Sequence, residues 1–318
     1  MMVITGAGGF IGGRLARRLQ DLGFKDLVLV DDFTNADKRA RVQNLTHRAL
    51  VQREMLPSWL TKHHESVQVV FHMGARTDTL LADQAVFQAL NLNYSQDLWR
   101  VCARYGLPLI YASSAATYGL GEQGFRDGTE VLPLLKPLNP YVLSKHQFDC
   151  WTAEQEERPL QAVGLKFFNV YGSGESHKGR MASVVWHAYG QIRESGRVRL
   201  FRSHHPDVAD GAQQRDFVTV EDVVEICLWF MNHGSCQGLY NVGTGRARSF
   251  RDLVLALFEA LGLEPQIEFV DTPLHLRAQY QYYTCADMGW MDRLACPHTF
   301  RDLKEGVQAY VRQEWGIV

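Results

Sequence analysis

Three glycines near the start of the chain restrict its fold more than any other feature. Gly6, Gly9 and Gly12 have the spacing G-x-x-G-x-x-G, follow the apolar run Met2–Thr5 and precede an amphipathic stretch over 12–22. A chain that turns sharply from a strand into a helix, with its backbone close to a phosphate, has no room for Cβ atoms at such positions. The helix N-terminus then presents unpaired N–H groups to the anion. The pattern predicts a turn that binds the pyrophosphate of a dinucleotide.

Apolar runs alternate with helical stretches through the first half of the chain. The runs are nearly continuous in Val, Ile, Leu and Phe, which is typical of parallel strands covered on both faces. The expected strands are 2–5, 27–30, 67–72, 107–113 and 162–170, and the expected helices are 12–22, 83–104 and 140–156. This alternation predicts an α/β fold built on a doubly wound parallel sheet of the Rossmann type.

The patterning loosens after residue 171. Helices are expected over 181–195, 221–232 and 253–261, and a polar loop over 202–214 separates the first two. We therefore expect residues 1–170 to form a dinucleotide-binding domain. Residues 171–318 are expected to form a smaller C-terminal α/β substrate domain, with segments that cross between the two.

Composition excludes several classes of protein. The 318 residues carry 33 Lys and Arg against 35 Asp and Glu, and the net charge of −2 gives no positive field to attract nucleic acid. No stretch reaches the roughly 18 apolar residues of a membrane span, and the glycines after Thr5 interrupt the N-terminal apolar run too early for a signal peptide. Six dispersed cysteines lack zinc-ligand spacing. We expect reduced thiols, no metal and a cytoplasmic location.

Acidic residues follow the second expected strand. Asp31 lies 19 positions after Gly12, and Asp32 is next to it. A carboxylate at this point accepts hydrogen bonds from the adenosine ribose hydroxyls, which favours NAD. Cations that can pair with the 2′-phosphate of NADP come soon afterwards: Lys38, Arg39, Arg41 and Arg53. The residues alone leave NAD and NADP as nearly equal alternatives.

A tyrosine and a lysine are spaced for proton transfer. Tyr141 and Lys145 are four residues apart, so on a helix they share one face. The lysine charge favours phenolate, and we expect it to lower the tyrosine pKa from about 10. A phenolate can take the proton of an alcohol while hydride leaves its carbon. Ser114 ends the strand expected before this helix, at the sheet edge where α/β proteins place their sites, and its hydroxyl can bridge the substrate oxygen and Tyr141.

With these features placed, the chain resembles the extended short-chain dehydrogenases/reductases that act on nucleotide sugars. Within them it resembles the ADP-L-glycero-D-manno-heptose 6-epimerases. The matching segments are Tyr-Ala-Ser-Ser-Ala-Ala-Thr-Tyr-Gly at 111–119, Pro-Leu-Asn-Pro-Tyr at 137–141, Phe-Phe-Asn-Val-Tyr-Gly at 167–172, His-Lys-Gly at 177–179, Gln-Arg-Asp-Phe-Val at 214–218 and Asn-Val-Gly-Thr-Gly-Arg at 241–246. The segment from His177 to Val184 discriminates most, because general nucleotide-sugar enzymes do not share it.

The resemblance implies an isomerase that inverts C6 of an ADP-glycero-manno-heptose by transient oxidation and re-reduction, for lipopolysaccharide inner-core synthesis. It favours bound NADP, with NAD as the alternative, and implies a homo-oligomer, with a pentamer suspected. It also implies a role for each matching residue. Tyr141 and Lys178 are the expected acid/base pair, assisted by Lys145 and Ser114. The expected cofactor-site residues are Gly6, Gly9, Phe10, Ile11, Gly12, Asp31, Asp32, Lys38, Arg53, Met73, Ala75, Asn91, Tyr141, Lys145, Val170 and Lys178. The expected substrate-site residues are Ser114, Asn169, Arg180, His187, Phe201, Arg215 and Tyr280.

Three departures from the family pattern concern substrate and cofactor rather than chemistry. Arg180 replaces a common serine, the segment 73–77 (Met-Gly-Ala-Arg-Thr) replaces Glu-Gly-Ala-Cys-Ser, and loop 202–214 is longer than expected. The alternatives are a 4-epimerase of the same superfamily, which leaves Lys178 unexplained, and a non-catalytic dinucleotide sensor, which the Ser114, Tyr141 and Lys145 set disfavours. A 4,6-dehydratase needs an acidic residue directly after the active-site hydroxyl residue. In this chain Ala115 and Ala116 follow Ser114, so that group is missing.

Overall fold

The computed structural model of the protein describes residues 1–79, 81–277 and 280–317. These residues form two compact units, between which the chain passes several times. The first comprises Met1–Thr117, Asp127–Lys166 and Val224–Tyr240, and the second comprises Tyr118–Arg126, Phe167–Val223 and Asn241–Val318. The division of the chain into domains 1–170 and 171–318 stays a prediction.

The first unit is built on a seven-stranded sheet with the order β10-β6-β5-β4-β1-β2-β3. The strands are β1 (Met2–Thr5), β2 (Leu27–Asp31), β3 (Ala49–Gln52), β4 (Val69–His72), β5 (Leu109–Ser114), β6 (Ala162–Phe167) and β10 (Gln237–Val242). β1 pairs in parallel with β2 and β4, β2 with β3, and β4 with β5. Every residue of β1, β2 and β4 is buried, as expected for strands covered on both faces. The predicted α/β fold with a doubly wound parallel sheet is confirmed.

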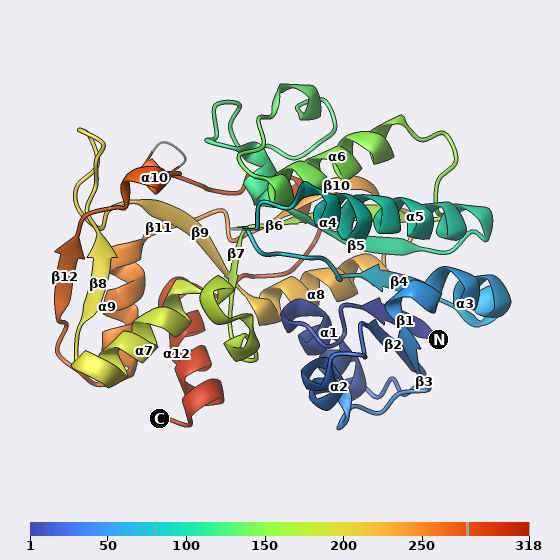
Figure 1. The fold of residues 1–318 in the computed structure, drawn as a ribbon, viewed down its shortest axis with the longest axis horizontal. Coiled ribbons are helices and arrows are strands. Elements are labelled where there is room, and N and C mark those ends of the chain that lie inside the picture. Colours follow the sequence, from blue (N-terminus) through green and yellow to red (C-terminus); the bar gives the residue numbers. More distant parts are fainter. Residues whose placement is uncertain (80, 278–279, 318) are drawn as a thin grey trace. The chain divides into compact units, whose positions relative to one another are not determined.

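Helices cover both faces of this sheet (Figure 1). Helices α4, α5 and α6 lie on one face, and α1 and α8 lie on the other, where Arg18 of α1 forms an ion pair with Glu225 of α8 (2.6 Å). The α-helices are α1 (Phe10–Asp21), α2 (Ala36–Val42), α3 (Leu56–His63), α4 (Gln84–Phe87), α5 (Tyr94–Arg104), α6 (Pro140–Glu154) and α8 (Val220–Met231). A π-helical turn, η3 (Gln88–Asn93), joins α4 to α5, and short 3₁₀ turns are η1 (Arg53–Met55), η2 (His64–Ser66), η4 (Ala115–Tyr118) and η5 (Leu132–Leu134).

The second unit contains two small sheets. In one, β9 (Gln214–Thr219) lies between β11 (Ala247–Ser249) and β7 (Asn169–Tyr171), and in the other β8 (Val198–Phe201) pairs in parallel with β12 (Ile267–Val270). The helices are α7 (Val184–Ser195), α9 (Phe250–Ala260), α10 (Leu274–Arg277), α11 (Trp290–Arg293) and α12 (Leu303–Trp315), with the 3₁₀ segment η6 (Ser176–Met181) before α7. Val185 of α7, Leu257 of α9 and Val307 of α12 are fully buried in one apolar core.

The expectation of a single strand over 162–170 is wrong. The apolar run divides at Phe168, whose backbone N–H donates to Val242 O (3.0 Å). β6 pairs within the seven-stranded sheet, whereas β7 pairs with β9. Apolar continuity alone does not reveal which partner a strand takes, so the change of sheet was invisible in the sequence.

Across residues 1–79, 81–277 and 280–317, none of the helices combines the length and the apolar character that crossing a membrane requires.

Candidate active site

The glycine-rich turn lies between β1 and α1 and leaves no space for a Cβ at Gly6 or Gly12. Gly6 has φ +67, and a Cβ there would lie 2.7 Å from Gly74 Cα on the loop after β4. A Cβ at Gly12 would overlap the Gly6 carbonyl. Gly9 is the N-cap of α1, with no side-chain cap and no acidic residue in the first turn of the helix. This backbone cradle fits an anion such as a dinucleotide pyrophosphate.

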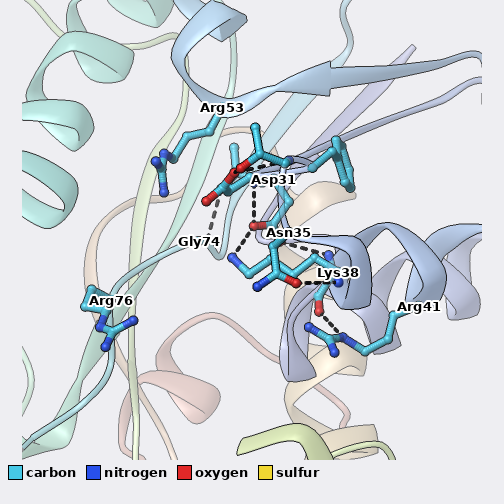
Figure 2. A network of polar contacts seen from close by, with 12 residues as sticks. Asp31, Asn35, Lys38, Arg41, Arg53, Gly74 and Arg76 are labelled. Atoms are coloured by element: carbon cyan, nitrogen blue, oxygen red, sulfur yellow. Dashed lines mark hydrogen bonds and ion pairs between the residues drawn. The ribbon is translucent and has the colours of Figure 1, made fainter.

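The buried carboxylate of Asp31 organises the turn (Figure 2). Its Oδ2 accepts from Gly8 N (3.0 Å), and its Oδ1 accepts from Asp32 N (2.8 Å) and Lys38 Nζ (2.6 Å). Arg41 Nε donates to Gly8 O (2.6 Å) from the same helix that carries Lys38. Asp31 therefore joins the end of β2 to the turn, and Lys38 brings a half-buried cation to the same place.

Asp32 and Arg53 lie beside this network. Asp32 Oδ1 accepts from Thr34 N (3.3 Å) and Gln52 Nε2 (3.2 Å). These bonds, led by one from the Thr34 hydroxyl, hold the pKa of Asp32 below its usual range, with a further contribution from Arg53. Arg53 is partly buried and pairs with Glu54. The structure thus brings together at this edge both the carboxylates and two of the cations that the sequence singled out.

The loop after β4 contains Met73 and Ala75. Figure 2 shows Gly74 of this loop next to the Asp31 network and Arg76 farther along the loop. Buried Asn91 fixes this loop: its Oδ1 accepts from Arg76 N (2.8 Å) and its Nδ2 donates to Arg76 O (2.9 Å). Asn91 also donates to Ser144 Oγ (3.0 Å) on α6. Asn91 thus connects the predicted cofactor side of the unit with the helix that carries Tyr141.

Helix α6 begins where the sequence predicts. Asn139 caps it by accepting from Val142 N (3.0 Å), and Pro140 occupies its first turn. Three side chains on successive turns of one face then attach to β5: Tyr141 hydrogen-bonds Ser114, Lys145 Nζ donates to Ala112 O (2.7 Å), and Asp149 accepts from Ser113. The predicted grouping of Ser114, Tyr141 and Lys145 is therefore present in the folded unit.

The prediction that Lys145 lowers the pKa of Tyr141 is wrong for the chain by itself. Burial raises the pKa of Tyr141, and the hydrogen bond from Ser114 only partly opposes this. Burial also lowers the pKa of Lys145 to about 8, against the charge of Asp149. Desolvation thus outweighs the nearby charge, which leaves Tyr141 as a protonated phenol.

Sequence reasoning missed a buried ion pair below these residues. Lys166 Nζ lies 2.6 Å from Asp149 Oδ2, and both side chains are fully buried. Asp149 Oδ2 also accepts from Ser113 Oγ (2.7 Å), and Lys166 donates to Thr117 Oγ1 (2.8 Å). The available signal was the spacing: Asp149 follows Lys145 by four residues, as Lys145 follows Tyr141.

The second unit groups three of the expected substrate residues. Arg215 on β9 is 8% exposed, and its guanidinium lies 5.4 Å from the ring centre of Phe250 and 5.7 Å from that of Tyr280. Phe201 at the end of β8 meets the Tyr280 ring edge-on, with centroids 6.5 Å apart. Burial lowers the pKa of Arg215 to about 10, with Tyr280 opposing. A desolvated guanidinium flanked by aromatic rings fits a phosphate or diphosphate group.

Lys178 and Arg180 lie on η6, whose backbone bends at Gly179 (φ 53, ψ −126). Only glycine adopts this conformation easily, so Gly179 permits a backbone kink between Lys178 and Arg180. Burial lowers the pKa of Lys178, and Glu175 opposes the shift. Of the remaining predicted residues, Asn169 and Val170 lie on β7, which pairs with the strand that carries Arg215, and exposed His187 lies on α7.

Comparisons with known proteins agree on one family. Residues 2–243 match the model of the NAD dependent epimerase/dehydratase family. An ADP-L-glycero-D-manno-heptose-6-epimerase from Nitratidesulfovibrio vulgaris is 43% identical over 316 residues, which cover 98% of this chain and 97% of that protein.

Solved structures show the same fold. The ADP-L-glycero-D-manno-heptose-6-epimerase of Helicobacter pylori superposes with a TM-score of 0.81 at 26% identity, covering 98% of this chain and 94% of that one. A UDP-glucose 4-epimerase from Thermus thermophilus, in complex with NAD, superposes with a TM-score of 0.80 at 24% identity, covering 100% of this chain and 99% of that one.

Proposed function

This chain belongs to the NAD dependent epimerase/dehydratase family and, within it, to the ADP-L-glycero-D-manno-heptose-6-epimerases, and on that basis we propose that it inverts C6 of the heptose in an ADP-glycero-manno-heptose. The observation that carries the proposal is the attachment of Tyr141, Lys145 and Asp149 to the end of β5, in a chain that matches such an epimerase over nearly its whole length.

The chemistry follows from the substrate. A secondary alcohol carbon is not acidic enough to be inverted by direct deprotonation, so the centre must become planar through oxidation to a ketone. When bound, the nicotinamide dinucleotide supplies the acceptor for the C6 hydride and returns the same hydride. The protein must take the hydroxyl proton as the hydride leaves, and give a proton to the ketone oxygen as the hydride returns to the opposite face.

Two acid/base groups are proposed for these proton transfers. Tyr141 is held as a protonated phenol by burial, so its Oη is ready to donate a proton to a ketone oxygen. Ser114 orients that phenol, and Lys145 is the adjacent cation that stabilises phenolate after the proton has left. Lys178 is the proposed second group, because burial lowers its pKa and allows it to exchange a proton more readily than a free lysine.

Other residues are proposed to bind. Arg215 with the rings of Phe201 and Tyr280 would hold the diphosphate of the substrate, and Asn169, Arg180 and His187 would contact the rest of it. In the first unit, the glycine-rich turn would hold the cofactor pyrophosphate. The residues of the turn proposed to line this site are Gly6, Gly9, Phe10, Ile11 and Gly12. The homo-oligomer, suspected to be a pentamer, stays a prediction. Light scattering tests it by measuring the molar mass of the protein in solution.

The direct test uses the purified chain and its bound dinucleotide. Incubation with ADP-D-glycero-D-manno-heptose should produce the C6 epimer, seen by NMR, and deuterium placed at C6 should remain on that carbon in the product. Loss of the label to solvent would contradict transient hydride transfer. Inversion of a UDP-hexose at C4 instead would indicate the 4-epimerase alternative.

Replacing Lys178 with methionine tests the second acid/base group. We expect kcat to fall by about a hundredfold or more, because the variant can no longer exchange the proton at that position. Circular dichroism should show an unchanged fold, since Met keeps the length of the aliphatic chain. Lys304→Met, on an exposed lysine of α12 in the same unit, is the control and should retain wild-type kcat. Wild-type kcat in Lys178→Met would remove Lys178 from the mechanism.

We also propose that the cofactor is NADP. Lys38 pairs with Asp31 at the end of β2 (Figure 2), and the charge of Arg53 acts on the adjacent Asp32. A 2′-phosphate would give Lys38 a second anionic partner, which is the contact that separates NADP from NAD.

Lys38→Ala should weaken NADP binding more than NAD binding. A charge-assisted hydrogen bond contributes about 1.5–3 kcal/mol, so the Kd for NADP should rise by roughly ten- to a hundredfold. Fluorescence titration of the cofactor-free protein with each dinucleotide measures the two Kd values. Lys25→Ala, on an exposed lysine before β2 in the same unit, is the matched control. An equal loss for NAD and NADP would show that Lys38 acts only by supporting Asp31.

A further inference from the structure

A buried carboxylate of the second unit is not among the site residues that the sequence predicts. Glu175 is fully buried just before η6, and hydroxyl and backbone N–H groups donate to its carboxylate. Its Oε2 accepts from Ser183 N (2.5 Å), and its Oε1 accepts from Ser183 Oγ (2.6 Å) and Tyr310 Oη (2.9 Å). Burying a carboxylate costs free energy that such bonds must offset, so an amide or an apolar residue would be the cheaper way to fill this space.

These hydrogen bonds join the two ends of the segment that carries Lys178. Glu175 accepts from Ser183 at the far end and, through a longer contact of 3.4 Å, from Gly172 N at the near end. Within the segment, Lys178 N donates to the backbone O of Glu175 (2.9 Å), and Ala182 N donates to Gly179 O (3.0 Å). The Glu175 carboxylate thereby fixes the backbone on both sides of Lys178.

Helix α12 supports the same segment through a second acid. Glu314 Oε2 accepts from Ser173 Oγ (2.7 Å) and Gly174 N (3.1 Å). Glu175 and Glu314 therefore both hold the segment, one through Ser183 and Tyr310 and the other through Ser173 and Gly174. They differ in their relation to Lys178: the Lys178 N–H donates to the backbone O of Glu175 (2.9 Å), and the Glu175 charge opposes the effect of burial on the pKa of Lys178.

The other ionisable groups around this segment come from three elements. His177 and Arg180 are on η6 itself, Tyr310 and Glu314 are on α12, and Glu221 is in the first turn of α8. Burial raises the pKa of Tyr310, and the charges of Glu175, Glu314 and Glu221 raise it further, so Tyr310 remains a protonated donor to Glu175.

We propose that Glu175 is a positioning residue that fixes the segment carrying Lys178 and stabilises the Lys178 ammonium ion electrostatically. The effect on turnover rests on the proposed acid/base role of Lys178, whereas the effect on the ammonium ion does not. The experiment therefore measures Lys178 directly as well as kcat.

The test compares Glu175→Gln with Glu314→Gln in the full chain. Lysine labelled with ¹³C at Cε reports each pKa by NMR titration, and the chain has few enough lysines for Lys178→Arg to identify the Lys178 signal. We expect the pKa of Lys178 to fall by about one unit or more in Glu175→Gln and to stay unchanged in Glu314→Gln. The pKa seen in the pH profile of kcat should fall with it in Glu175→Gln alone.

Two results would overturn the proposal: an unchanged Lys178 pKa in Glu175→Gln, or an equal fall in both variants, which would indicate a merely structural role. If Glu175→Gln does not fold, Glu175→Asp retains the charge but draws it back. The pKa of Lys178 is then expected to fall in Glu175→Asp by less than is expected for Glu175→Gln. An unchanged or higher Lys178 pKa overturns the proposal. Full activity of Lys178→Met alongside a lowered pKa in Glu175→Gln would reject the acid/base role of Lys178 and leave the electrostatic effect of Glu175 standing.

Discussion

Replacing Tyr141 with phenylalanine is expected to lower kcat for C6 inversion by about a hundredfold or more, because a positioned general acid or base contributes a factor of about 10²–10⁴. The variant loses only the phenol oxygen that bonds Ser114. Its ring still packs near Phe87, where the wild-type rings have centroids 6.2 Å apart. Bound dinucleotide, measured by its absorbance after release, should therefore be unchanged while NMR detects little product.

Tyr111→Phe is the matched control for this prediction. Tyr111 is another buried tyrosine of the first unit, and its hydroxyl shares a hydrogen bond with Thr152 Oγ1 (3.2 Å). Removing that hydroxyl should lower the free energy of unfolding by roughly 1 kcal/mol and leave kcat near the wild-type value. Near-normal turnover in Tyr141→Phe would exclude Tyr141 as a proton donor or acceptor.

Lys166→Met is expected to destabilise the protein by about 3–5 kcal/mol, because it leaves the buried carboxylate of Asp149 without its cation. In the wild type, Asp149 Oδ1 already has no hydrogen-bond partner among the described residues, so Oδ2 carries all of its direct contacts. Urea unfolding followed by circular dichroism measures the change. We also expect lower kcat, since Asp149 anchors the last of the three turns that attach α6 to β5.

The double variant Asp149→Asn/Lys166→Met separates loss of the pair from exposure of an unpaired charge. It removes both charges and leaves an amide oxygen that can still accept from Ser113. We expect it to recover much of the stability that Lys166→Met loses, because replacing a buried ion pair by neutral groups often costs little. Equal destabilisation in the single and double variants would show that the uncompensated charge of Asp149 is not the cause.

The sequence was sufficient wherever the physical cause is local. Continuous apolar runs identify the strands of the parallel sheet, because those strands are buried on both faces. The glycines at 6 and 12 mark a turn that admits no Cβ at these positions, which is a property of the backbone itself. The spacing of Tyr141 and Lys145 predicts a shared helix face, because one helical turn separates them.

Tertiary structure alone decided the features that depend on distant residues or on burial. The partner of Asp149 is Lys166, and the partners of Glu175 are Ser183 and Tyr310, the last of which is 135 positions away. The raised pKa of Tyr141 reversed the expectation from charge alone, since desolvation can be judged only once the surroundings of the phenol are known. Sequence spacing therefore selected the reactive groups, and the folded chain determined their protonation and the residues that hold them in place.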